Sequence, residues 1–402
     1  MDPLISLLSD LVAANSVNPS LVPGAPGEAS VAEVARRAMV AAGLTVTVQD
    51  VRPGRPNVVG VLEGREPGPA VMLCGHLDTV GVEGMDAPFT PRIDQGRLYG
   101  RGSQDMKGGV AAMIGAAAAL APTWTRGRLI VAGLIDEEYE SAGAEALVKT
   151  WKADAAIVTE PTDLQMAVAH KGFAWLEITV HGRAAHGSRP AEGRDAIMAM
   201  GRVLHLLEHR DKTLQAREPA GLQGVASLHA SIITGGRELS MYPDRCVLQM
   251  ERRTVSGEEG DLPLLEIRAM LAALTSVIPE FHADVTLLTT RPPYALDPSH
   301  ALPRTLAASL ARRALPADPV GMSFWTDAAI LAEAGIPSIL FGPRGSGLHS
   351  VEEYVDVESV RVCRDVLAET VTALVRAEGK GQRRGRRQKK GGRCPKTLGR
   401  RA

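Results

Sequence analysis

Short apolar runs alternate with longer helical patterns over the first 160 residues of the chain. Five runs have the length and the β-branched content of buried strands: NVVGVL (57–62), AVMLCG (70–75), LIVAGLI (129–135), AAIVT (155–159) and, much later, SILFG (338–342). Two segments between them, KGGVAAMIGAAAALA and SAGAEALVKTWK, have helical composition and length. Continuous apolar strands separated by helices predict an α/β domain whose sheet is covered on both faces.

The pattern changes between residues 172 and 290. FAWLEITV (173–180) alternates as a half-exposed strand should, and three more segments are strand-like: GVASLHASIITGG, DRCVLQMERRT and ADVTLLTTR. Two amphipathic helices are predicted at DAIMAMGRVLHLLEH (195–209) and LLEIRAMLAALTSV. These four strands and two helices predict an α+β domain at 172–290, inserted into a discontinuous α/β domain made of residues 1–171 and 291–379.

Composition places the chain among globular proteins with a large core, since 45% of its 402 residues are apolar and 23% are charged. The opening MDPLISLLSDLVAANS predicts an amphipathic helix rather than a signal peptide, because Asp2 and Asp10 interrupt its apolar run. The apolar stretch from Val110 to Ala121 is too short to span a bilayer. We therefore expect a cytoplasmic protein with no membrane partner. The four cysteines are scattered and lack CxxC spacing, which argues against a thiolate metal site.

Charge is concentrated at the C-terminus. Residues 380–402 contain eleven Lys and Arg and no acid. Because the whole chain has a net charge of −1, residues 1–379 have a net charge of −12. This tail has no hydrophobic period and is predicted to be disordered. It lacks interleaved aromatic residues, so contact with nucleic acid would be salt-sensitive and non-specific, and no specific nucleic-acid partner is expected.

Acidic and histidine side chains follow the predicted strands. Each of them alone is typical of a solvated loop or a helix cap, but together they form a set: His76 and Asp78 after AVMLCG, Asp136, Glu137 and Glu138 after LIVAGLI, Glu160 after AAIVT, and His349 after SILFGPRGSG. Ligands bind beyond the carboxyl ends of the strands in an open α/β sheet, so these groups should converge. So many carboxylates without a counter-charge would cost several kcal/mol, a cost that divalent cations remove.

The ligand types suit Zn²⁺, Co²⁺ or Mn²⁺, because imidazoles and carboxylates are present and thiolates are not. Two such ions need a carboxylate that bridges them. Asp105 in GRGSQDMKGG is short, and the glycines around it let the backbone come close, which makes it the natural bridge. The same stretch fails as a phosphate loop, since it lacks the third glycine of a dinucleotide fingerprint and the GKS or GKT of a P-loop.

The chain contains six motifs that resemble those of a family of dimetal amidohydrolases, often called M20, which includes acetylornithine deacetylase, succinyl-diaminopimelate desuccinylase, aminoacylase and carboxypeptidase G2. The motifs are GHLDTV, GRGSQDMKGG, DEEYESAG, VTEPT, AAHGSRP and GLHSVEEYV. The resemblance extends from about residue 5 to residue 377. It implies two divalent ions, with Zn²⁺ favoured. His76 and Glu160 would hold one ion, Glu138 and His349 the other, and Asp105 both. Asp78 would fix the tautomer of His76. Glu137 would be the general base, since neighbours in an extended chain point opposite ways.

The resemblance also implies that 172–290 is a lid and dimerisation domain, so a homodimer is expected. His186 in AAHGSRP would donate to the scissile carbonyl oxygen, and Arg253 would bind a substrate carboxylate unless it is only an exposed strand charge. Ser240, where many members have Asn, and Thr326, preceded here by Trp325, would contact substrate.

The predicted function is hydrolysis of the amide bond of an N-acyl amino acid by metal-activated water. A carboxypeptidase or dipeptidase acting on short peptides is the alternative. An inactive metal-binding regulatory protein is less favoured, because no ligand is missing.

Overall fold

The computed structural model describes residues 2–258 and 260–388, and the chain divides into two compact units. The first unit contains residues up to 166, residues 299–318 and the residues from 334 onward. The second contains residues 167–298 and 319–333. These divisions lie a few residues from positions 172 and 290, and the segment 319–333, which the sequence places with the first domain, clusters with the second.

The first unit is built on a mixed sheet with the strand order β1-β2-β6-β3-β7-β15. The strands are β1 (Thr45–Arg52), β2 (Arg55–Glu63), β3 (Glu66–His76), β6 (Arg126–Leu134), β7 (Ala155–Val158) and β15 (Ser338–Leu340). β3 runs parallel to β6 and β7, and β15 runs parallel to β7, whereas β1 and β2 are antiparallel additions. All five apolar runs predicted as strands are therefore confirmed.

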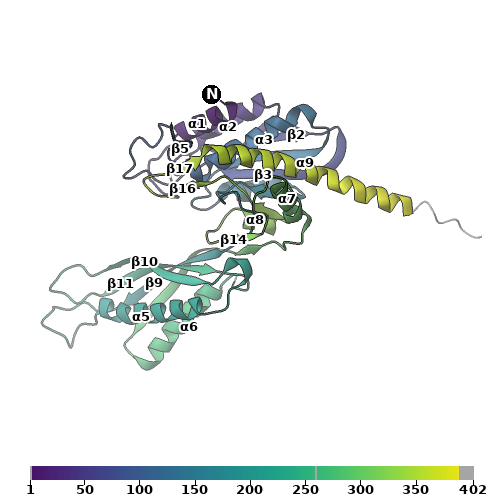
Figure 1. Ribbon diagram of the computed structural model, residues 1–402. Helices are drawn as coiled ribbons and strands as arrows, with labels where there is room; N and C mark the ends of the chain where they lie inside the picture. The colour runs from purple at the N-terminus through teal and green to yellow at the C-terminus, as the bar shows by residue number, and fades with distance from the viewer. Residues whose placement is uncertain (1, 259, 389–402) are drawn as a thin grey trace, which may run out of the picture. The chain divides into compact units, whose positions relative to one another are not determined.

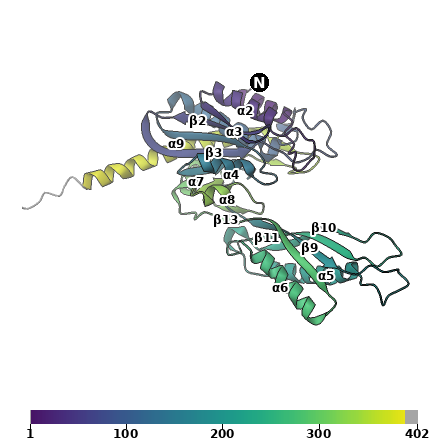
Figure 2. The same ribbon diagram turned by 180° about the vertical axis from the view of Figure 1, so that it is seen from behind.

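Helices cover both faces of this sheet. The helices are α1 (Pro3–Ala13), α2 (Ala29–Ala41), α3 (Gly108–Leu120), α4 (Ala142–Thr150), α7 (Ala301–Arg312) and α9 (Val357–Gln388). In Figure 1, α3 and α9 lie side by side across the sheet, and both pack against β3. The view from behind shows α4 on the opposite side (Figure 2). Every residue of β6 from Leu129 to Leu134 is buried, which explains the continuous apolar run in the sequence.

A small antiparallel sheet accompanies the main sheet in the first unit, with the order β16-β17-β5-β4. Its strands are β4 (Arg92–Asp94), β5 (Arg97–Tyr99), β16 (Gly345–Ser346) and β17 (Tyr354–Asp356). Tyr354 pairs with Tyr99, so residues near 350 lie beside residues near 100. Strands of two or three residues carry too little periodicity for sequence analysis to detect.

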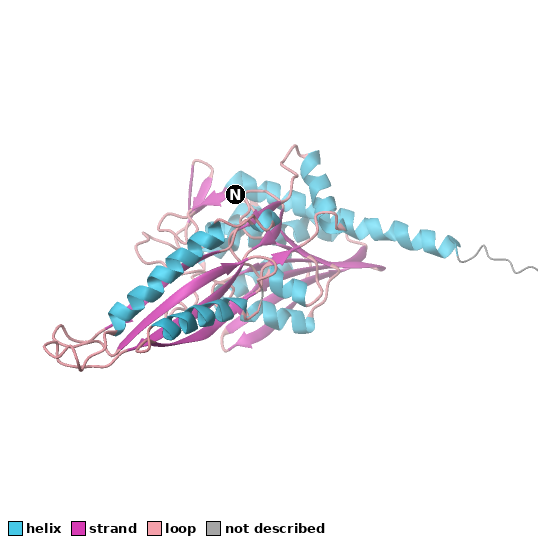
Figure 3. Ribbon diagram, turned by 90° about the horizontal axis from the view of Figure 1, so that it is seen from below, coloured by secondary structure: helices cyan, strands magenta, loops and turns pink. Residues whose placement is uncertain are grey.

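The second unit has a four-stranded antiparallel sheet with the order β10-β11-β9-β12. The elements of this sheet and its helices are β9 (Gly172–His181), α5 (Ala196–Gln215), β10 (Ser227–Gly235), β11 (Arg245–Thr254), α6 (Leu262–Val277) and β12 (His282–Arg291). The second unit also contains β8 (Ala167–His170), β13 (Tyr294–Ala295), β14 (Val320–Met322) and α8 (Ala328–Glu333), and β8 pairs with β13 and β14. Figure 3 shows α5 and α6 running along the strands. The four strands and two helices predicted at 172–290 are confirmed, and the chain has the mixed α/β fold with an inserted α+β unit.

The last described helix is longer than expected. Disorder was predicted from residue 380, but α9 continues to Gln388. Arg, Gln and Lys are good helix formers, and no proline interrupts this stretch. The remainder of the predicted tail, 389–402, lies outside the described residues. Among the helices of the described chain, none has both the length and the apolar character needed to cross a membrane.

Candidate metal centre

Strand ends and the loops beside them deliver five ligand-type side chains within the first unit. His76 is the last residue of β3, Glu160 follows β7, and Glu138 lies in the turn after β6. Asp105 comes from the turn Ser103–Lys107 that precedes α3, and His349 from the loop between β16 and β17. Because β3, β6 and β7 are parallel, their carboxyl ends meet at one edge of the sheet, as expected from the sequence.

These side chains form two groups that share one residue. Ligand atoms of His76, Asp105 and Glu160 all lie within 4.8 Å of one another, and so do those of Asp105, Glu138 and His349. Asp105 Oδ1 is 3.0 Å from His76 Nε2, while its other oxygen, Oδ2, is 3.3 Å from His349 Nε2. His349 Nε2 also lies 3.2 Å from Glu138 Oε2. Each oxygen of Asp105 therefore faces a different histidine, the arrangement that a bridging carboxylate requires.

A close contact of α3 with the segment after β7 helps bring these groups together. A Cβ at Gly109 would collide with the carbonyl oxygen of Thr159, the residue before Glu160. Only glycine allows the start of this helix to approach so closely. Gly109 thus permits a close backbone contact four residues after Asp105.

The electrostatics of the cluster are those of a site that attracts cations. Burial would raise the pKa of Asp105, but hydrogen bonds from His349 and His76 outweigh it and hold that pKa below its usual range. Burial and the charge of Asp105 raise the pKa of Glu138. Hydrogen bonds with Asp105 and Glu138 raise the pKa of His349 to about 10. Without a metal, the carboxylates therefore hold protons on the imidazoles as their counter-charge.

The donor set fits two divalent cations. It contains imidazole nitrogens and carboxylate oxygens and no thiolate, which suits Zn²⁺ and similar ions. Glu138 Oε1 is buried and accepts no hydrogen bond from any described residue, so an acceptor is left for a cation.

Asp78 acts differently from the sequence-based expectation. His76 Nδ1 lies 3.0 Å from the backbone oxygen of Asp78, whereas the nearer carboxylate oxygen is 3.7 Å away. The carbonyl group thus accepts from Nδ1–H, which leaves Nε2 to face the cluster. The carboxylate instead accepts the backbone N–H groups of Glu137, at 3.1 Å, and Glu138, at 3.2 Å. Asp78 therefore holds the turn that carries both glutamates.

That turn also changes the argument used to separate Glu137 from Glu138. The two residues lie in a turn and not in extended chain, so their different directions do not follow from strand alternation. Glu138 belongs to one of the two ligand groups, and Glu137 belongs to neither. Glu137 nevertheless lies near His76. Burial lowers the pKa of His76, but a hydrogen bond with Asp105 and the charges of Glu160, Asp105 and Glu137 outweigh burial and raise that pKa.

Several buried residues that support the cluster were not found from the sequence. Asn18 Nδ2 donates to Asp78 Oδ2 at 2.8 Å and to Asp136 Oδ1 at 3.1 Å. Arg55 Nη2 donates to Asp136 Oδ1 at 2.9 Å and to Glu28 Oε1 at 2.6 Å. A chain of hydrogen bonds thus connects Arg55 through Asp136 and Asn18 to Asp78, the residue that holds the glutamate turn. Asn18 follows α1 and Arg55 begins β2, and neither carries a local motif that signals this role.

The other predicted site residues lie in the second unit. His186 and Ser240 are brought together, since Met241 pairs with His186 and the Ser240 carbonyl accepts from Gly187 N at 2.7 Å. Arg253 Nε lies 3.0 Å from Glu251 Oε2, and its guanidinium carbon is 5.7 Å from the centre of the Phe173 ring.

Thr326, also in the second unit, is fully buried, and its hydroxyl accepts from Ala328 N at the start of α8. That geometry fits a helix cap better than a substrate contact.

Residues 72–373 match the model for peptidase family M20/M25/M40. The chain belongs to this family. An acetylornithine deacetylase from Myxococcus xanthus is 30% identical over 382 residues, which cover 92% of this chain and 96% of that protein. The M20 resemblance seen in the sequence motifs is thereby confirmed, and the protein is an M20-family hydrolase.

Solved structures share the fold of this M20 protein. A tripeptidase from Staphylococcus aureus has a TM-score of 0.78 at 20% identity, covering 93% of this chain and 98% of that chain. A dinuclear metal binding peptidase of the M20 family from Bacillus subtilis has a TM-score of 0.70 at 17% identity, covering 92% and 97%.

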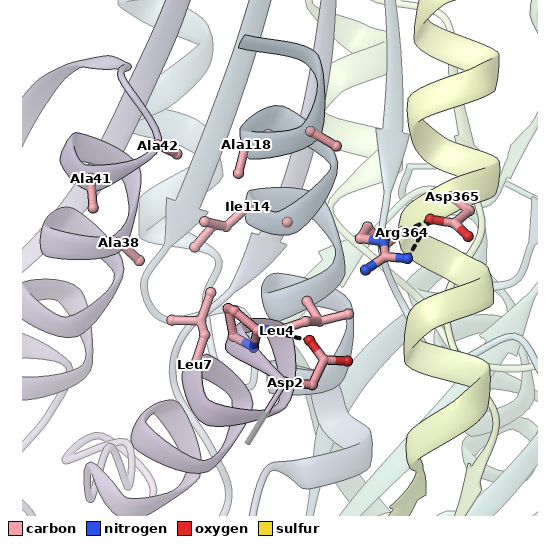
Figure 4. Close-up of a pocket in the computed structure, with 13 residues that line it drawn as sticks. Asp2, Leu4, Leu7, Ala38, Ala41, Ala42, Ile114, Ala118, Arg364 and Asp365 are labelled. Carbon is pink, nitrogen blue, oxygen red and sulfur yellow. Dashed lines mark hydrogen bonds and ion pairs between the residues drawn. The ribbon is translucent and has the colours of Figure 1, made fainter. Parts of the chain in front are cut away.

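A groove with a volume of about 540 Å³ lies away from the ligand cluster. Figure 4 shows it between α1, α2 and α3, with α9 on one side. Small apolar side chains form most of its wall. Its carboxylates are engaged, because Asp365 Oδ1 is 2.7 Å from Arg364 Nη2 and Asp2 caps α1. Among the described residues, the lining of this groove includes no histidine and no group arranged for hydrolysis.

Proposed function

We propose that this M20 hydrolase cleaves the amide bond of an N-acyl amino acid, releasing a carboxylic acid and a free amine. The observation that carries the proposal is the sharing of Asp105 between two groups of ligand-type side chains. The acetylornithine deacetylase relative, at 30% identity over nearly the whole chain, supports a deacylase over a peptidase.

The residues present would hold two divalent cations. His76, Asp105 and Glu160 would hold the first, and Asp105, Glu138 and His349 the second. When bound, such a pair polarises a carbonyl oxygen and lowers the pKa of a bound water to about 7. We propose Zn²⁺ as the metal, with Co²⁺ and Mn²⁺ as alternatives of similar ligand preference.

Glu137 is proposed as the general base. It lies beside the ligand Glu138, in the turn that Asp78 holds by two backbone hydrogen bonds. Its carboxylate would take a proton from the attacking water and deliver that proton to the leaving nitrogen, so that the amine departs neutral. Because Glu137 belongs to neither ligand group, its carboxylate would transfer protons and would not bind an ion.

His186 is proposed to stabilise the negative charge that develops on the carbonyl oxygen. His186 Nδ1 lies 2.8 Å from Ser188 Oγ and 3.2 Å from the backbone nitrogen of Ser188, so this ring nitrogen is engaged within its own loop. We propose that the other nitrogen, Nε2, faces the substrate. His186 is exposed, as a group that reaches a substrate must be.

Substrate recognition is assigned to the second unit. We propose that Arg253 binds the substrate carboxylate, since its side chain is partly exposed and Phe173 and Glu251 hold its guanidinium in place. Ser240 is exposed beside the His186 loop, where it would contact the acyl group.

A homodimer formed through the second unit is part of the proposal. β10 is an edge strand of the four-stranded sheet, and it exposes Ile232 by 58% and Ile233 by 50%. An apolar edge strand favours pairing with a second copy. Sedimentation should show a dimer, and Ile232→Lys together with Ile233→Lys should give monomers. A monomeric unmodified protein would contradict this part.

The substrate class can be tested with a panel of N-acetyl amino acids, N-succinyl amino acids and dipeptides, assayed on protein reconstituted with Zn²⁺ or Co²⁺. We expect the acyl amino acids to give the higher kcat/KM. Preference for dipeptides would support the carboxypeptidase or dipeptidase alternative. Full metal occupancy with no turnover of any substrate would support the inactive regulatory alternative.

A further inference from the structure

Glu353 makes an unusual set of contacts near the ligand cluster. It lies four residues after His349, immediately before β17, and is only 1% exposed. Its Oε1 accepts the backbone N–H of Gln104 at 2.9 Å and that of Asp105 at 3.1 Å. Its Oε2 accepts the backbone N–H of Gly102 at 3.0 Å. One side chain therefore binds three amides of the loop that carries the shared ligand.

The loop needs such a partner because its backbone is irregular. Gly102 has a φ of 78°, and Asp105 has a φ of −113° and a ψ of 96°, so the amides between them have no regular ladder of carbonyl groups to donate to. Buried amides left without an acceptor cost free energy. Successive N–H groups that converge in such a loop form a concave site for an anion, and the Glu353 carboxylate fills it.

The charge of Glu353 is balanced within the same contact. Arg101 Nη1 lies 2.7 Å from Glu353 Oε2, and both side chains are buried. Arg101 also donates to the carbonyl oxygen of Gly81 at 3.1 Å and to that of Ser350 at 3.0 Å. The ion pair thus adds no net charge beside the cluster, and it ties the Asp105 loop to the loop that carries His349.

We propose that Glu353 is a positioning residue for the metal pair, which orients Asp105 so that each of its carboxylate oxygens faces a different ion. This proposal rests on the proposed function, because it requires two bound cations. Fixing the backbone at residues 102, 104 and 105 fixes the direction in which the short Asp105 side chain points. Removing the Glu353 carboxylate would let the Asp105 loop reorient and would thereby weaken metal binding.

The test compares Glu353→Gln with Glu352→Gln as a matched control. Glu352 is the neighbouring residue, is exposed, and loses the same charge in the substitution. The full-length, metal-stripped proteins are titrated with Co²⁺ and followed by calorimetry and visible absorption. We expect two ions in the unmodified protein and in Glu352→Gln. In Glu353→Gln we expect at least one ion to bind about 10- to 100-fold more weakly, with an altered cobalt spectrum.

The outcomes separate this proposal from the proposed function. If the unmodified protein fails to bind two ions, the two-metal function itself is wrong. If it binds two, and Glu353→Gln binds both with unchanged affinity and spectrum, only the positioning role is refuted. A lower melting temperature with normal metal binding would likewise mean that Glu353 is merely structural.

A second variant covers the case in which Glu353→Gln does not fold by circular dichroism. Glu353→Asp keeps the charge that faces Arg101 but is one methylene shorter, so it cannot reach all three amides. We expect metal affinity between that of the unmodified protein and that of a fully disrupted site. Affinity equal to that of the unmodified protein would overturn the proposal.

Discussion

Asn18 donates a hydrogen bond to the carboxylate of Asp78 at 2.8 Å, in an entirely buried contact between residues sixty positions apart. The same amide group donates to Asp136 at 3.1 Å, so one side chain joins two buried carboxylates, and Asp136 immediately precedes the glutamate turn. The Asp78 oxygen that accepts from Asn18 also accepts from the amide of Glu138, so Asn18 helps to orient the carboxylate that holds the turn. The geometry of the turn that carries Glu137 and Glu138 therefore depends on Asn18, a residue from a distant part of the chain.

Asn18→Ala should lower both stability and metal affinity. It removes one donor from each of two buried carboxylate oxygens, while Asp78 Oδ2 keeps the amide of Glu138 and Asp136 Oδ1 keeps Arg55. Each lost hydrogen bond to a charged group costs about 1.5–3 kcal/mol. Urea unfolding would measure the loss. Asn15→Ala is the control, because Asn15 makes one local hydrogen bond with the amide of Val17, and its effect should be smaller. Equal stability for the two variants would contradict this account of Asn18.

Glu137→Gln should reduce kcat by about 10²- to 10⁴-fold, because an amide cannot accept and return the proton. Metal content, measured by atomic emission, should stay at two ions per chain, since Glu137 belongs to neither ligand group. Glu140→Gln is the control from the same turn, where Glu140 is exposed and pairs with Arg52 at the surface. A near-normal rate in Glu137→Gln would remove Glu137 from the role of base.

Chelation should destabilise the protein. The clustered carboxylates are balanced by cations when metal is bound and must share protons with the histidines when it is not. Metal bound only to the folded state also adds stability by mass action. We expect the melting temperature to fall on treatment with a chelator and to recover with Zn²⁺ or Co²⁺. An unchanged melting temperature, with removal of metal verified by emission, would argue against a two-metal cluster.

His170 should make stability depend on pH in the metal-free protein. Burial lowers the pKa of His170 to about 4, whereas an unfolded histidine has a pKa of about 6.5. The unfolded state therefore binds a proton first as the pH falls, and stability is lost between about pH 6.5 and pH 4. The loss at pH 5 should be about 2 kcal/mol.

That pH dependence can be assigned to His170 by substitution. The difference in unfolding free energy between pH 8 and pH 5 should shrink in His170→Gln and should be unchanged in His282→Gln, since His282 is exposed in the same unit. Identical pH profiles for the unmodified protein and His170→Gln would show that His170 is not the group responsible.

Truncation after Ala377 should leave kcat and KM unchanged. All five ligand-type residues precede this position, and so does the Glu353 loop. The full-length chain is the control, assayed with the same metal and substrate. If the truncated protein is folded and metal-loaded but has lost turnover, the basic tail has a role in catalysis.

Local chemistry made much of this molecule predictable. The main strands and the helices α5 and α6 appear in the apolar pattern, because a sheet covered on both faces excludes polar residues and an amphipathic helix places apolar residues every three to four positions. The helix α3 is buried on nearly all sides, and its alanine-rich composition made it predictable. The ligand types at the strand ends were readable for a similar reason. Imidazole and carboxylate groups are costly beside buried strands unless something binds them.

The supporting contacts could not be read in the same way. Glu353 binds the amide of Asp105 across 248 positions, and Arg55 binds Asp136 across 81. Neither residue stands in a pattern that distinguishes it from a solvated Glu or Arg.

The sequence alone determined the strand pattern and the inserted α+β unit, since burial leaves marks in the local order of residues. The strand ends offered a wider set of acids and histidines, and the resemblance of the motifs to a known family singled out five of them. Only the tertiary structure decided that one oxygen of Asp105 faces His76 and the other faces His349, that Asp78 binds the amides of the glutamate turn, and that Glu353 binds the amides of the Asp105 loop. Those relationships are hydrogen bonds between distant segments. Their partners are set by where the folded chain brings backbone amides and carboxylates together.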